Sequence, residues 1–463
     1  MTRTANAALT PARRWLAFAV LLAGGFLPPI DFFIVNVALP SIRTTLGATP
    51  PQVQLVISGY AAAFAAFLIT GGRIGDLFGR KRLFVLSMAG FTATSALCGF
   101  ATSPDLLVIG RVLEGLCAAF LTPQVLGSVR ALFAGEALAK ALSFYSAMIG
   151  LSAATGQFLG GALTAADIFG LGWRVVFLVN LPIGIVAVAA GTALVPETSA
   201  STRPRLDLGG VALASVGLLC LVLPLSEGPA RGWPAWSIAM LAAFPFLLVG
   251  FLWFEDRVGA RGGMPLLDLG LLRIPTFRRG VLVAMLFFFT SPFYLLFAIF
   301  EQAGLGLDAL HTGLAIVPYG VGLFTGPLAS APLTRHSRRA LFGIGMGIQV
   351  SGYTGVTLCT GSLIDGGLLI ASLFIGGFGQ GIAMPRLISL VLGDVSPHQA
   401  GLAAGVLNSM LQIGAAVSVA AIGSLFFVVL GSATGPEAYA HAMTWAMTAV
   451  TLALGSALLL GVI

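Results

Sequence analysis

The sequence predicts an all-α integral membrane protein. Of its 463 residues, 57% are hydrophobic and 9% are charged, and the mean hydropathy is +0.99, whereas about 25% of the residues in a soluble domain are charged. Apolar runs recur along the whole chain, and many reach the length of about 20 residues that a helix needs to cross a bilayer. These observations exclude a soluble globular protein, a disordered chain and a disulfide-stapled secreted domain.

Charged and turn residues divide the apolar sequence into fourteen predicted spans. The first run follows Arg13 and Arg14; it is too long for a signal-peptide core and lacks a small-residue cleavage site, so we expect a retained helix. Gly and Pro inside the runs are compatible with membrane helices. The spans are predicted at residues 15–40, 52–72, 83–103, 105–129, 141–165, 173–195, 207–226, 235–254, 281–303, 309–332, 340–361, 366–392, 400–430 and 438–461.

The basic residues predict the orientation of these spans. With the N-terminus inside, the inner segments hold nineteen Lys and Arg residues and the outer loops hold three. Because basic residues accumulate in cytoplasmic loops, the count favours an even number of spans with both termini cytoplasmic. The sequence has no basic stripe interleaved with aromatic residues, so a nucleic-acid partner is not expected.

An internal repeat divides the chain into halves. RIGDLFGRKRLF at 73–84 resembles PLTRHSRRALF at 332–342, at an offset of 258 residues. Two related six-helix bundles separated by an additional helix pair would explain this offset. We therefore expect an N-terminal bundle at 1–200, the additional pair at 201–260 and a C-terminal bundle at 261–463. Such repeats are common in secondary transporters, whose substrate site lies between the halves.

Sequence signals for enzymatic chemistry are missing. Neither lysine lies in a G-x-x-x-x-G-K-[ST] phosphate loop. GIGMG at 343–347 and GGFGQG at 376–381 are embedded in predicted spans, which favours helix packing over nucleotide binding. The four histidines are scattered without metal-ligand spacing. We expect no catalytic residues, no metal and no cofactor.

Charges buried in a membrane are costly and usually functional. Asp31 lies within the first span beside Pro28 and Pro29, which interrupt helical hydrogen bonding and bend the helix. Low-dielectric surroundings disfavour the charged form of a carboxyl group, so reversible proton binding is the leading interpretation. The alternative is a carboxylate fixed by hydrogen bonds at the bend.

Four further charged residues lie in predicted spans. Arg111 and Glu114 are three residues apart and share a helix face, where they either neutralise each other or take part in proton transfer. Glu301, near the outer end of its span, is either a coupling residue or partly solvated. Arg386 lies about six residues from the inner end of its helix and either reaches the interface or contacts substrate.

The segment GGRIGDLFGRKRLF predicts a tight connection between two helices. Gly75 and Gly79 suit a turn of two to three residues, and Asp76 lies close to Arg80, Lys81 and Arg82. An acid among bases at a helix terminus suits a breakable latch on the cytoplasmic side. The alternative interpretation is a solvated set of charges.

With these residues in view, the chain resembles the Major Facilitator Superfamily, and more specifically its fourteen-helix drug:proton antiporter subfamily, over essentially its whole length. GRIGDLFGRKRL matches the signature loop, IDFFIVNVALP the first-helix motif, IGRVLEGLCAAFLTP the fourth-helix motif with Glu114 in place of the usual Gln, and GLSAATGQFLGG the fifth-helix motif with Gln157 in place of Pro. The resemblance implies a protonatable acid at Asp31, an Asn at Asn36, a buried Arg at Arg111, a gate acid at Asp76 and motif glycines at Gly156, Gly160 and Gly161, whereas Arg386 departs from the usual small residue or Pro. Together with the residues themselves, it leads us to expect proton coupling at Asp31, Arg111, Glu114 and Glu301; a cytoplasmic gate of Gly72, Gly75, Asp76, Gly79, Arg80 and Arg130; an antiporter motif of Gly150, Gly156, Gln157, Gly160 and Gly161; and a substrate cavity with Asn36, Gln124, Phe293, Tyr294 and Arg386.

We therefore expect a monomeric exporter in the cytoplasmic membrane that exchanges inward protons for an amphipathic small molecule by alternating access. The Phe-rich segment at 286–297 either lines an apolar pocket or packs against neighbouring helices and lipid. Two other functions stay open. One is the export of a defined metabolite, lipid or organic anion, which intramembrane arginines would suit. The other is a non-transporting membrane sensor.

Overall fold

The computed structural model describes residues 10–198, 208–228, 231–261, 265, 269–330, 337–362, 366–395, 400–431 and 433–462. These residues form helices and connecting turns, without a strand among them. Ten of the described helices are long and apolar enough to cross a membrane, or up to eleven when the bent pair Leu55–Leu68 and Thr70–Phe78 counts as one span. The prediction of an all-α membrane fold is confirmed.

The chain divides into two compact units. Unit 1 comprises residues 1–145 and 166–268, and unit 2 comprises residues 146–165 and 269–463. The long helix α6 (Gly135–Ala166) contributes its first part to unit 1 and its remainder to unit 2. The repeated loop of unit 2 falls partly on residues 331–336, which lie outside the described residues.

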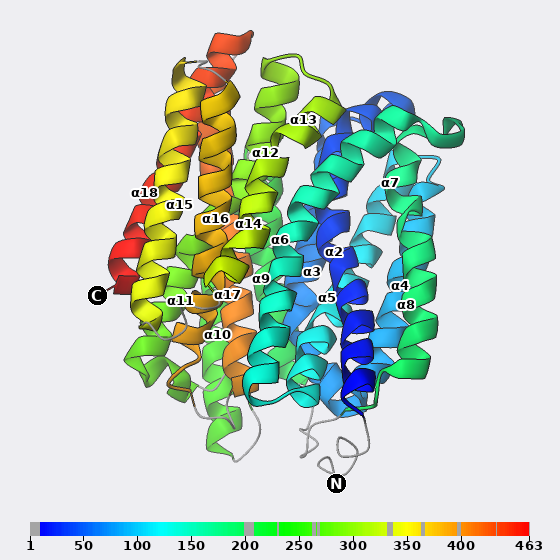
Figure 1. The fold of residues 1–463 in the computed structure, drawn as a ribbon, viewed down its shortest axis with the longest axis vertical. Coiled ribbons are helices and arrows are strands. Elements are labelled where there is room, and N and C mark those ends of the chain that lie inside the picture. The colour runs from blue at the N-terminus through cyan, green and yellow to red at the C-terminus, as the bar shows by residue number, and fades with distance from the viewer. Residues whose placement is uncertain are drawn as a thin grey trace. The chain divides into compact units, whose positions relative to one another are not determined.

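Unit 1 begins with helices whose ends are fixed by local chemistry. The Thr10 hydroxyl accepts a hydrogen bond from the Arg13 N–H at 3.4 Å, and the Ser103 hydroxyl accepts one from the Leu106 N–H at 3.2 Å; both are N-caps. The helices of unit 1 besides α6 are α2 (Pro11–Leu46), α3 (Pro50–Phe78), α4 (Arg80–Gly99), α5 (Pro104–Leu132), α7 (Val175–Leu178), α8 (Asn180–Leu194), α9 (Leu208–Glu227) and α10 (Ala235–Ala260), with short 3₁₀ turns at Ile168–Gly170 and Gly172–Arg174 (Figure 1).

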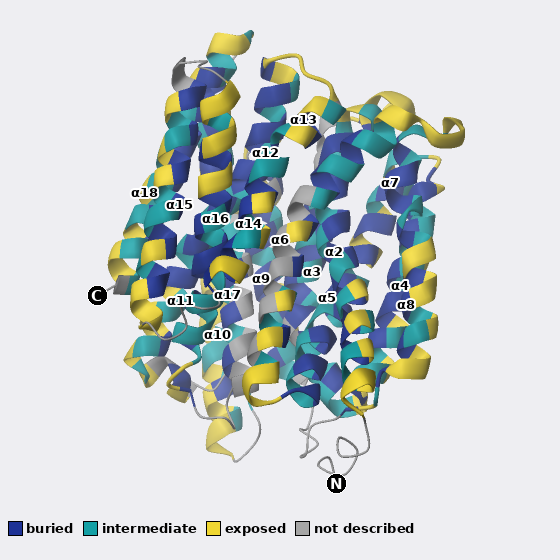
Figure 2. Ribbon diagram, viewed as in Figure 1, coloured by how far each residue is buried: buried dark blue, intermediate teal, exposed yellow. Residues whose placement is uncertain are grey.

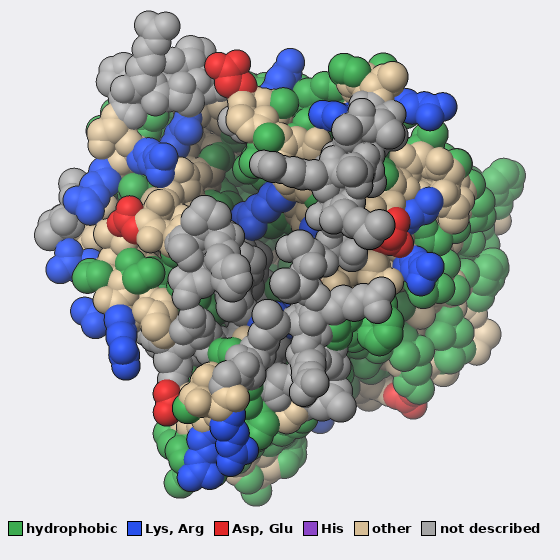
Figure 3. Space-filling model, turned by 90° about the horizontal axis from the view of Figure 1, so that it is seen from below, with side chains coloured by type: hydrophobic (Ala, Val, Ile, Leu, Met, Phe, Trp, Pro, Cys, Tyr) green, Lys and Arg blue, Asp and Glu red, His purple; other side chains and the backbone are tan. Residues whose placement is uncertain are grey.

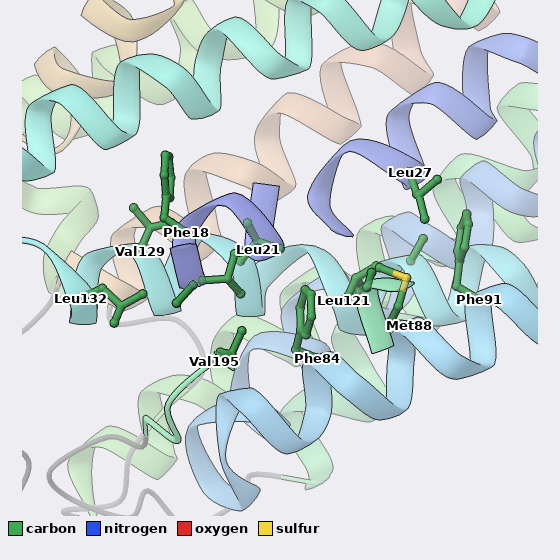
Figure 4. Packing of buried hydrophobic residues seen from close by; sticks show 14 of the residues in the cluster. Phe18, Leu21, Leu27, Phe84, Met88, Phe91, Leu121, Val129, Leu132 and Val195 are labelled. Carbon is green, nitrogen blue, oxygen red and sulfur yellow. The ribbon is translucent and has the colours of Figure 1, made fainter. Parts of the chain in front are cut away.

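A hydrophobic core joins α2, α4 and α5. Leu27, Phe84, Met88, Phe91 and Leu121 are buried and lie in one cluster (Figure 4). The aromatic ring of Phe84 lies so close to Gly24 that a Cβ there would come within 2.6 Å of it. A small residue at this position therefore lets α2 and α4 approach, as is usual between membrane helices.

The additional helix pair is attached to unit 1 through α3. Glu227 accepts a hydrogen bond from the Ser58 hydroxyl at one end of α9. Further along, the Ser215 hydroxyl donates to the Ala66 carbonyl at 2.8 Å, and Arg73 Nη2 donates to the Pro265 carbonyl at 2.6 Å. The contacts at Ser58 and Ala66, about two turns apart, fasten α9 to α3, and Arg73 ties the segment that follows α10 to the same helix.

Unit 2 contains the second series of helices. Pro292 cannot donate a backbone hydrogen bond, and the predicted span at 281–303 is interrupted by a 3₁₀ turn at Phe288–Thr290 and ends in a π-helix at Phe300–Gly304. The remaining elements are a 3₁₀ turn at Leu269–Arg273, α11 (Pro275–Phe287), α12 (Ser291–Ile299), α13 (Ala309–Ala315), α14 (Val317–Ser330), α15 (Arg338–Ser362), α16 (Gly366–Val391), α17 (Ala400–Leu430) and α18 (Pro436–Val462).

The two glycine-rich segments pack helices together, as predicted. A Cβ at Gly379 of α16 would overlap with the Gln349 backbone of α15, and one at Gly345 would lie 2.8 Å from the Ala383 nitrogen. Both segments are helical throughout. The glycines therefore let the backbones of α15 and α16 come into close contact, and the segments do not form nucleotide-binding loops.

Matched contacts within the two units reveal the internal repeat. In unit 1, Gln124 of α5 donates to the Gly71 carbonyl at 2.8 Å, and in unit 2, Arg386 of α16 donates to the Ser330 carbonyl at 2.9 Å. A Cβ on Gly115 would overlap with the Tyr60 carbonyl, just as one on Gly377 would overlap with the Tyr319 carbonyl. These correspondences have offsets of 259 and 262 residues, close to the 258 of the repeated loops.

Large apolar side chains cover the outer faces of both units. Val186 of α8 is 66% exposed, Phe246 of α10 80% and Leu358 of α15 63%. Exposed residues recur along helices such as α8 and α15 (Figure 2). Such faces would promote aggregation in water, whereas they suit contact with lipid. Basic side chains are exposed where helices begin, including Arg13, Arg82 and Arg338, and Lys and Arg are prominent in the view from below (Figure 3).

Candidate functional site

A buried charge cluster in unit 1 joins Asp31, Arg111 and Glu114. Arg111 Nη1 donates to Asp31 Oδ2 and lies 2.8 Å from Glu114 Oε2. All three residues are 0% exposed. Asp31 comes from the Pro28–Pro29 region of α2, and the other two come from one face of α5. All three are among the predicted proton-coupling residues, and the structure places them in one cluster with a shared guanidinium.

Asn180 completes the surroundings of Asp31. Its Nδ2 donates to Asp31 Oδ1 at 3.0 Å and also lies 3.0 Å from the Ser95 hydroxyl, which donates to the Phe177 carbonyl at 3.1 Å. Asn180 and Ser95 are fully buried and were not among the sequence-predicted site residues. A polar residue in the otherwise apolar segment WRVVFLVNLPIG is the signal that could have identified Asn180.

Backbone and aromatic groups hold the Arg111 side chain in place. Its Nε donates to the Val56 carbonyl at 3.0 Å, and its guanidinium carbon lies 4.2 Å from the ring centroid of Tyr60. The Tyr60 hydroxyl donates to the Pro28 carbonyl at 3.2 Å. Stacking on an aromatic face and hydrogen bonding to several acceptors are the usual means of keeping a buried guanidinium charged.

The charge balance of this cluster favours proton binding. Two ionised carboxylates beside one guanidinium would carry a net negative charge in surroundings that disfavour unpaired charge. Uptake of one proton makes the cluster neutral. Two carboxylates on one guanidinium can therefore take up a proton, and the part of this cluster in proton coupling stays a prediction.

Glu301 lies elsewhere, in unit 2. It is 3% exposed and belongs to the π-helix Phe300–Gly304. The partly solvated alternative is therefore wrong. Its backbone carbonyl accepts a hydrogen bond from the Leu307 N–H at 3.0 Å, which fixes the end of this helix. Glu301 is a second buried acid, and its part in proton coupling stays a prediction.

The predicted gate residues lie where α3 meets α4. Asp76 Oδ1 is 2.8 Å from Arg80 Nη2, and Arg80 Nη1 donates to the Gly127 carbonyl of α5 at 3.0 Å. The turn is shorter than the predicted two to three residues: α3 ends at Phe78, α4 begins at Arg80, and Gly79 alone separates them with φ +104°. Positive φ costs glycine little, which allows the reversal within one residue.

Of the other two glycines, Gly75 serves packing and Gly72 does not require it, and Glu197 joins the charges. Gly75 is helical, and a Cβ there would overlap with the Gln124 side chain, whereas a Cβ on Gly72 would be in ordinary contact with Pro123. Glu197, which the sequence analysis missed, accepts a hydrogen bond from the Lys81 N–H at 3.1 Å. Arg130 lies in the last turn of α5 and is partly buried.

The predicted antiporter motif lies in α6. Gly156, Gln157, Gly160 and Gly161 are buried. A Cβ on Gly313 of α13 would come within 2.9 Å of the Gln157 carbonyl, so these helices approach closely within unit 2. Gly150 falls on α6, but its surroundings lie outside the described residues.

The predicted cavity residues are distributed over both units, with Asn36 and Gln124 in unit 1 and Phe293, Tyr294 and Arg386 in unit 2. Asn36 is buried in α2, while Gln124 and Arg386 make the matched backbone contacts described above. Phe293 and Tyr294 lie in unit 2, with ring centroids 5.5 Å apart. Phe293 is fully buried among aromatic rings, so packing describes its present contacts. No group of three or more metal-ligating side chains occurs in the described part of the chain.

The fold and the buried charge cluster define a polytopic membrane transporter, and comparisons with known proteins give its family. The family model described as Major Facilitator Superfamily matches residues 21–419 of the chain. The chain is therefore a member of the Major Facilitator Superfamily and a multi-pass protein of the cytoplasmic membrane.

Several relatives are named as antibiotic exporters. The chain is 40% identical to the "Probable actinorhodin transporter" of Streptomyces coelicolor, over 91% of this chain and 74% of that protein. It is 34% identical to the "Puromycin resistance protein pur8" of Streptomyces alboniger, over 89% and 82% of the two chains. The "Tetracenomycin C resistance and export protein" of Streptomyces glaucescens is 30% identical, over 93% of this chain and 79% of that protein.

Solved structures support the fold. The proton:xylose symporter XylE has a TM-score of 0.68 and 14% sequence identity, with 97% of this chain and 95% of that chain covered. The human organic anion transporter MFSD10 has a TM-score of 0.62 and 17% identity, with 96% and 100% covered. Such a likeness concerns the fold alone, because one fold hosts transporters of different solutes.

Proposed function

We propose that this protein is a proton-coupled antiporter that exports amphipathic small molecules across the cytoplasmic membrane. Its relatives named as antibiotic export and resistance proteins support the export function. The observation that carries proton coupling is the fully buried cluster of Asp31, Arg111 and Glu114 with two acids for one base. The coupling ion is the proton, and no further cofactor is required.

The proposal also includes the complete membrane architecture and the oligomeric state. Fourteen membrane-spanning helices, with both termini cytoplasmic, form two six-helix bundles and the additional pair α9–α10. The protein acts as a monomer. The even number of spans agrees with the distribution of basic residues in the sequence, and the pair α9–α10 belongs to unit 1 through its contacts with α3.

In this mechanism, protonation changes the balance of charge around Arg111. When the carboxylates share one proton, the guanidinium has a single ionised partner, and the attraction between α2 and α5 falls. The Asp76–Arg80 contact at the α3–α4 turn would open and close as the protein alternates between its two states. One charge that crosses 100 mV supplies about 2.3 kcal/mol, enough for about a 50-fold substrate gradient.

Export of a defined metabolite, lipid or organic anion is the second candidate. Arg386 is half-buried and donates to a backbone carbonyl, so its remaining N–H groups can donate hydrogen bonds to an anion. Arg111 suits this role less, because two carboxylates already surround its guanidinium. Competition between lipophilic cations and organic anions for transport distinguishes the two candidates.

The test is transport by proteoliposomes under a pH gradient. Asp31→Asn keeps the shape of the side chain and removes the titratable group, so we expect it to abolish substrate-dependent proton flux. Asp105→Asn is the matched control, because Asp105 lies at the exposed start of α5 and is expected to retain flux. Wild-type proton-driven export by the Asp31→Asn protein would contradict the assignment of this cluster.

A further inference from the structure

The internal repeat places tyrosines in unit 2 where unit 1 has its polar and charged residues. Pro292-Phe293-Tyr294 corresponds to Pro29-Ile30-Asp31, so Tyr294 stands at the equivalent of Asp31. Tyr319 corresponds to Tyr60 through the matched glycine contacts, and Tyr353 corresponds to Ser95 at the offset of 258 residues. The equivalents of Arg111 and Glu114 are Leu373 and Gly376. Unit 2 therefore has an uncharged counterpart of the proton-binding cluster.

The tyrosines form one cluster, which we call the tyrosine cluster: Tyr294, Tyr319 and Tyr353 with Phe293 and Gln380. The Tyr319 and Tyr353 hydroxyls are 3.0 Å apart, and Tyr319 also hydrogen-bonds to Gln380 Oε1. The Phe293 ring centroid lies 5.3 Å from the centroids of both Tyr319 and Tyr353. Helices α12, α14, α15 and α16 thus direct three phenol rings and an amide to one place.

A nearby amide is buried without a partner. Gln349 of α15 is 0% exposed, and neither its side-chain oxygen nor its nitrogen has a hydrogen-bond partner among the described residues. It lies one helical turn before Tyr353 on the same face, and its backbone packs against Gly379, the neighbour of Gln380. Because a buried unsatisfied amide is costly, this arrangement is explained by a ligand that supplies the missing hydrogen bonds.

The charges near the tyrosine cluster are few. Among the described residues of its four helices and the π-helix that extends α12, the acids and bases are Glu301, Arg338, Arg339 and Arg386. Arg338 and Arg339 lie at the start of α15, and Arg386 is engaged with Ser330. Glu301 lies seven residues after Tyr294. Among these elements, the acid is therefore about two helical turns from Tyr294 along the chain.

We propose that the tyrosine cluster, together with Gln349, is a binding site for the hydroxyl or carbonyl groups of a planar, uncharged aromatic compound. The proposal rests on the export function proposed above and assigns the two tasks to different units, proton binding to unit 1 and substrate recognition to unit 2. The rings offer edge and face contacts to an aromatic solute, and the phenol and amide groups donate and accept hydrogen bonds.

Binding exchanges contacts within the cluster for contacts with the solute. The Tyr319–Tyr353 hydrogen bond opens, each hydroxyl takes a hydroxyl or carbonyl group of the compound, and the Gln349 amide gains a partner. Hydrogen bonds to such groups discriminate strongly against an analogue that lacks them, because the buried groups of the site are then left unpaired.

The experiment compares two probes on the full-length purified protein in detergent micelles without a proton gradient. The affinities for 1,4-dihydroxyanthraquinone and for anthracene, a planar three-ring compound without hydroxyl or carbonyl groups, are measured by the quenching of protein fluorescence. Wild-type protein is expected to prefer the hydroxylated probe. Tyr319→Phe and Tyr353→Phe, which keep the ring, are expected to lower affinity for the hydroxylated probe about 5- to 10-fold each and to leave the other probe unchanged.

Tyr439→Phe is the matched control, because Tyr439 is a partly buried tyrosine of unit 2 whose ring packs on Phe426 at 6.3 Å outside the cluster. The assignment would be overturned if the Phe variants lost affinity for both probes equally or kept the wild-type preference for the hydroxylated probe. It would also be overturned if the wild-type protein did not bind the hydroxylated probe. Failure of the proposed function is seen separately, as wild-type vesicles without substrate-dependent proton flux.

Discussion

Asn180 of α8 donates a hydrogen bond to Asp31 Oδ1 of α2 at 3.0 Å, although 149 positions separate the two residues. The same amide reaches Ser95 of α4 at 3.0 Å. One neutral side chain thus links the proton-binding cluster to two further helices of unit 1. Any movement of α8 relative to α2 must break or re-form this contact.

We expect Asn180→Leu to impair transport, although the two side chains are of similar size. The substitution leaves an Asp31 oxygen and the Ser95 hydroxyl without this donor, and an unsatisfied buried group costs about 1–3 kcal/mol. Proton-driven export should fall about 10-fold or more for a loss of about 1.4 kcal/mol, as measured in proteoliposomes. Thr192→Leu replaces an exposed polar residue of the same helix α8, whose hydroxyl donates to the Ala189 carbonyl, and provides the comparison. Equal effects of both variants would contradict a specific role for Asn180.

The matched glycines predict equivalent packing defects in the two units. Gly115→Ala and Gly377→Ala each place a Cβ against a tyrosine backbone carbonyl that cannot rotate away, so α5 must move from α3 and α16 from α14. Overpacking of this kind costs about 1–3 kcal/mol, which should lower the unfolding temperature in detergent. Gly250→Ala, where the added Cβ has open space, should be neutral or slightly stabilising. If Gly250→Ala lowered the unfolding temperature while Gly115→Ala and Gly377→Ala did not, the argument from the repeat would be refuted.

Glu197 should stabilise the start of α4. Its carboxylate accepts the Lys81 N–H at 3.1 Å and lies 3.8 Å from Arg82 Nε, and a negative charge near a helix N-terminus is favourable. Glu197→Ala is expected to cost about 0.5–1 kcal/mol because the carboxylate is partly exposed. Faster hydrogen exchange of the first α4 amides would reveal this. Glu136→Ala, at an exposed position of α6, should leave those amides unchanged.

Attachment of the additional helix pair predicts different effects of two substitutions at Glu227. The Glu227 carboxylate accepts hydrogen bonds from Ser58 and from Arg231 of the following turn. Glu227→Gln keeps an oxygen that can accept from Ser58, whereas Glu227→Ala removes both acceptors from a position that is 1% exposed. The alanine variant should lose about 1–3 kcal/mol and the glutamine variant much less, as seen in thermal unfolding. An equally stable alanine variant would show that this contact does not hold α9 on α3.

The N-cap of α13 should make the start of this helix sensitive to acid. The Asp308 carboxylate accepts a hydrogen bond from the His311 N–H at 2.8 Å, and this bond lowers the pKa of Asp308 below its ordinary value of 3.8. The stabilisation is therefore complete above the ordinary value and is lost as the pH falls through the lowered pKa. The protection of the His311 amide, expressed relative to its intrinsic exchange rate at each pH, should fall in acid in the wild type, whereas Asp308→Asn, a neutral cap, should show no such change.

Much of the candidate site follows from the sequence because its signals are local. A carboxylate beside two prolines in an apolar run, an Arg–Glu pair at helical spacing and a glycine-rich loop with an acid among bases each identify their residues within a few positions. The helical class of the fold follows from hydropathy for the same reason, because every backbone polar group in lipid must be satisfied within the segment. The length of the turn at Gly79 was harder to predict from the sequence, because the residues at which α3 ends and α4 begins depend on how these two helices pack.

The amino-acid order alone determined that this is a helical membrane protein and which rare charges it buries, because both depend on composition over one helix length. Only the tertiary structure decided that Asp31 and Glu114 share Arg111, that Asn180 joins them, and that tyrosines occupy the equivalent place in unit 2. The physical reason is that contacts between residues far apart in the chain depend on which helix faces pack together, and a periodic apolar pattern does not specify the partner of each face.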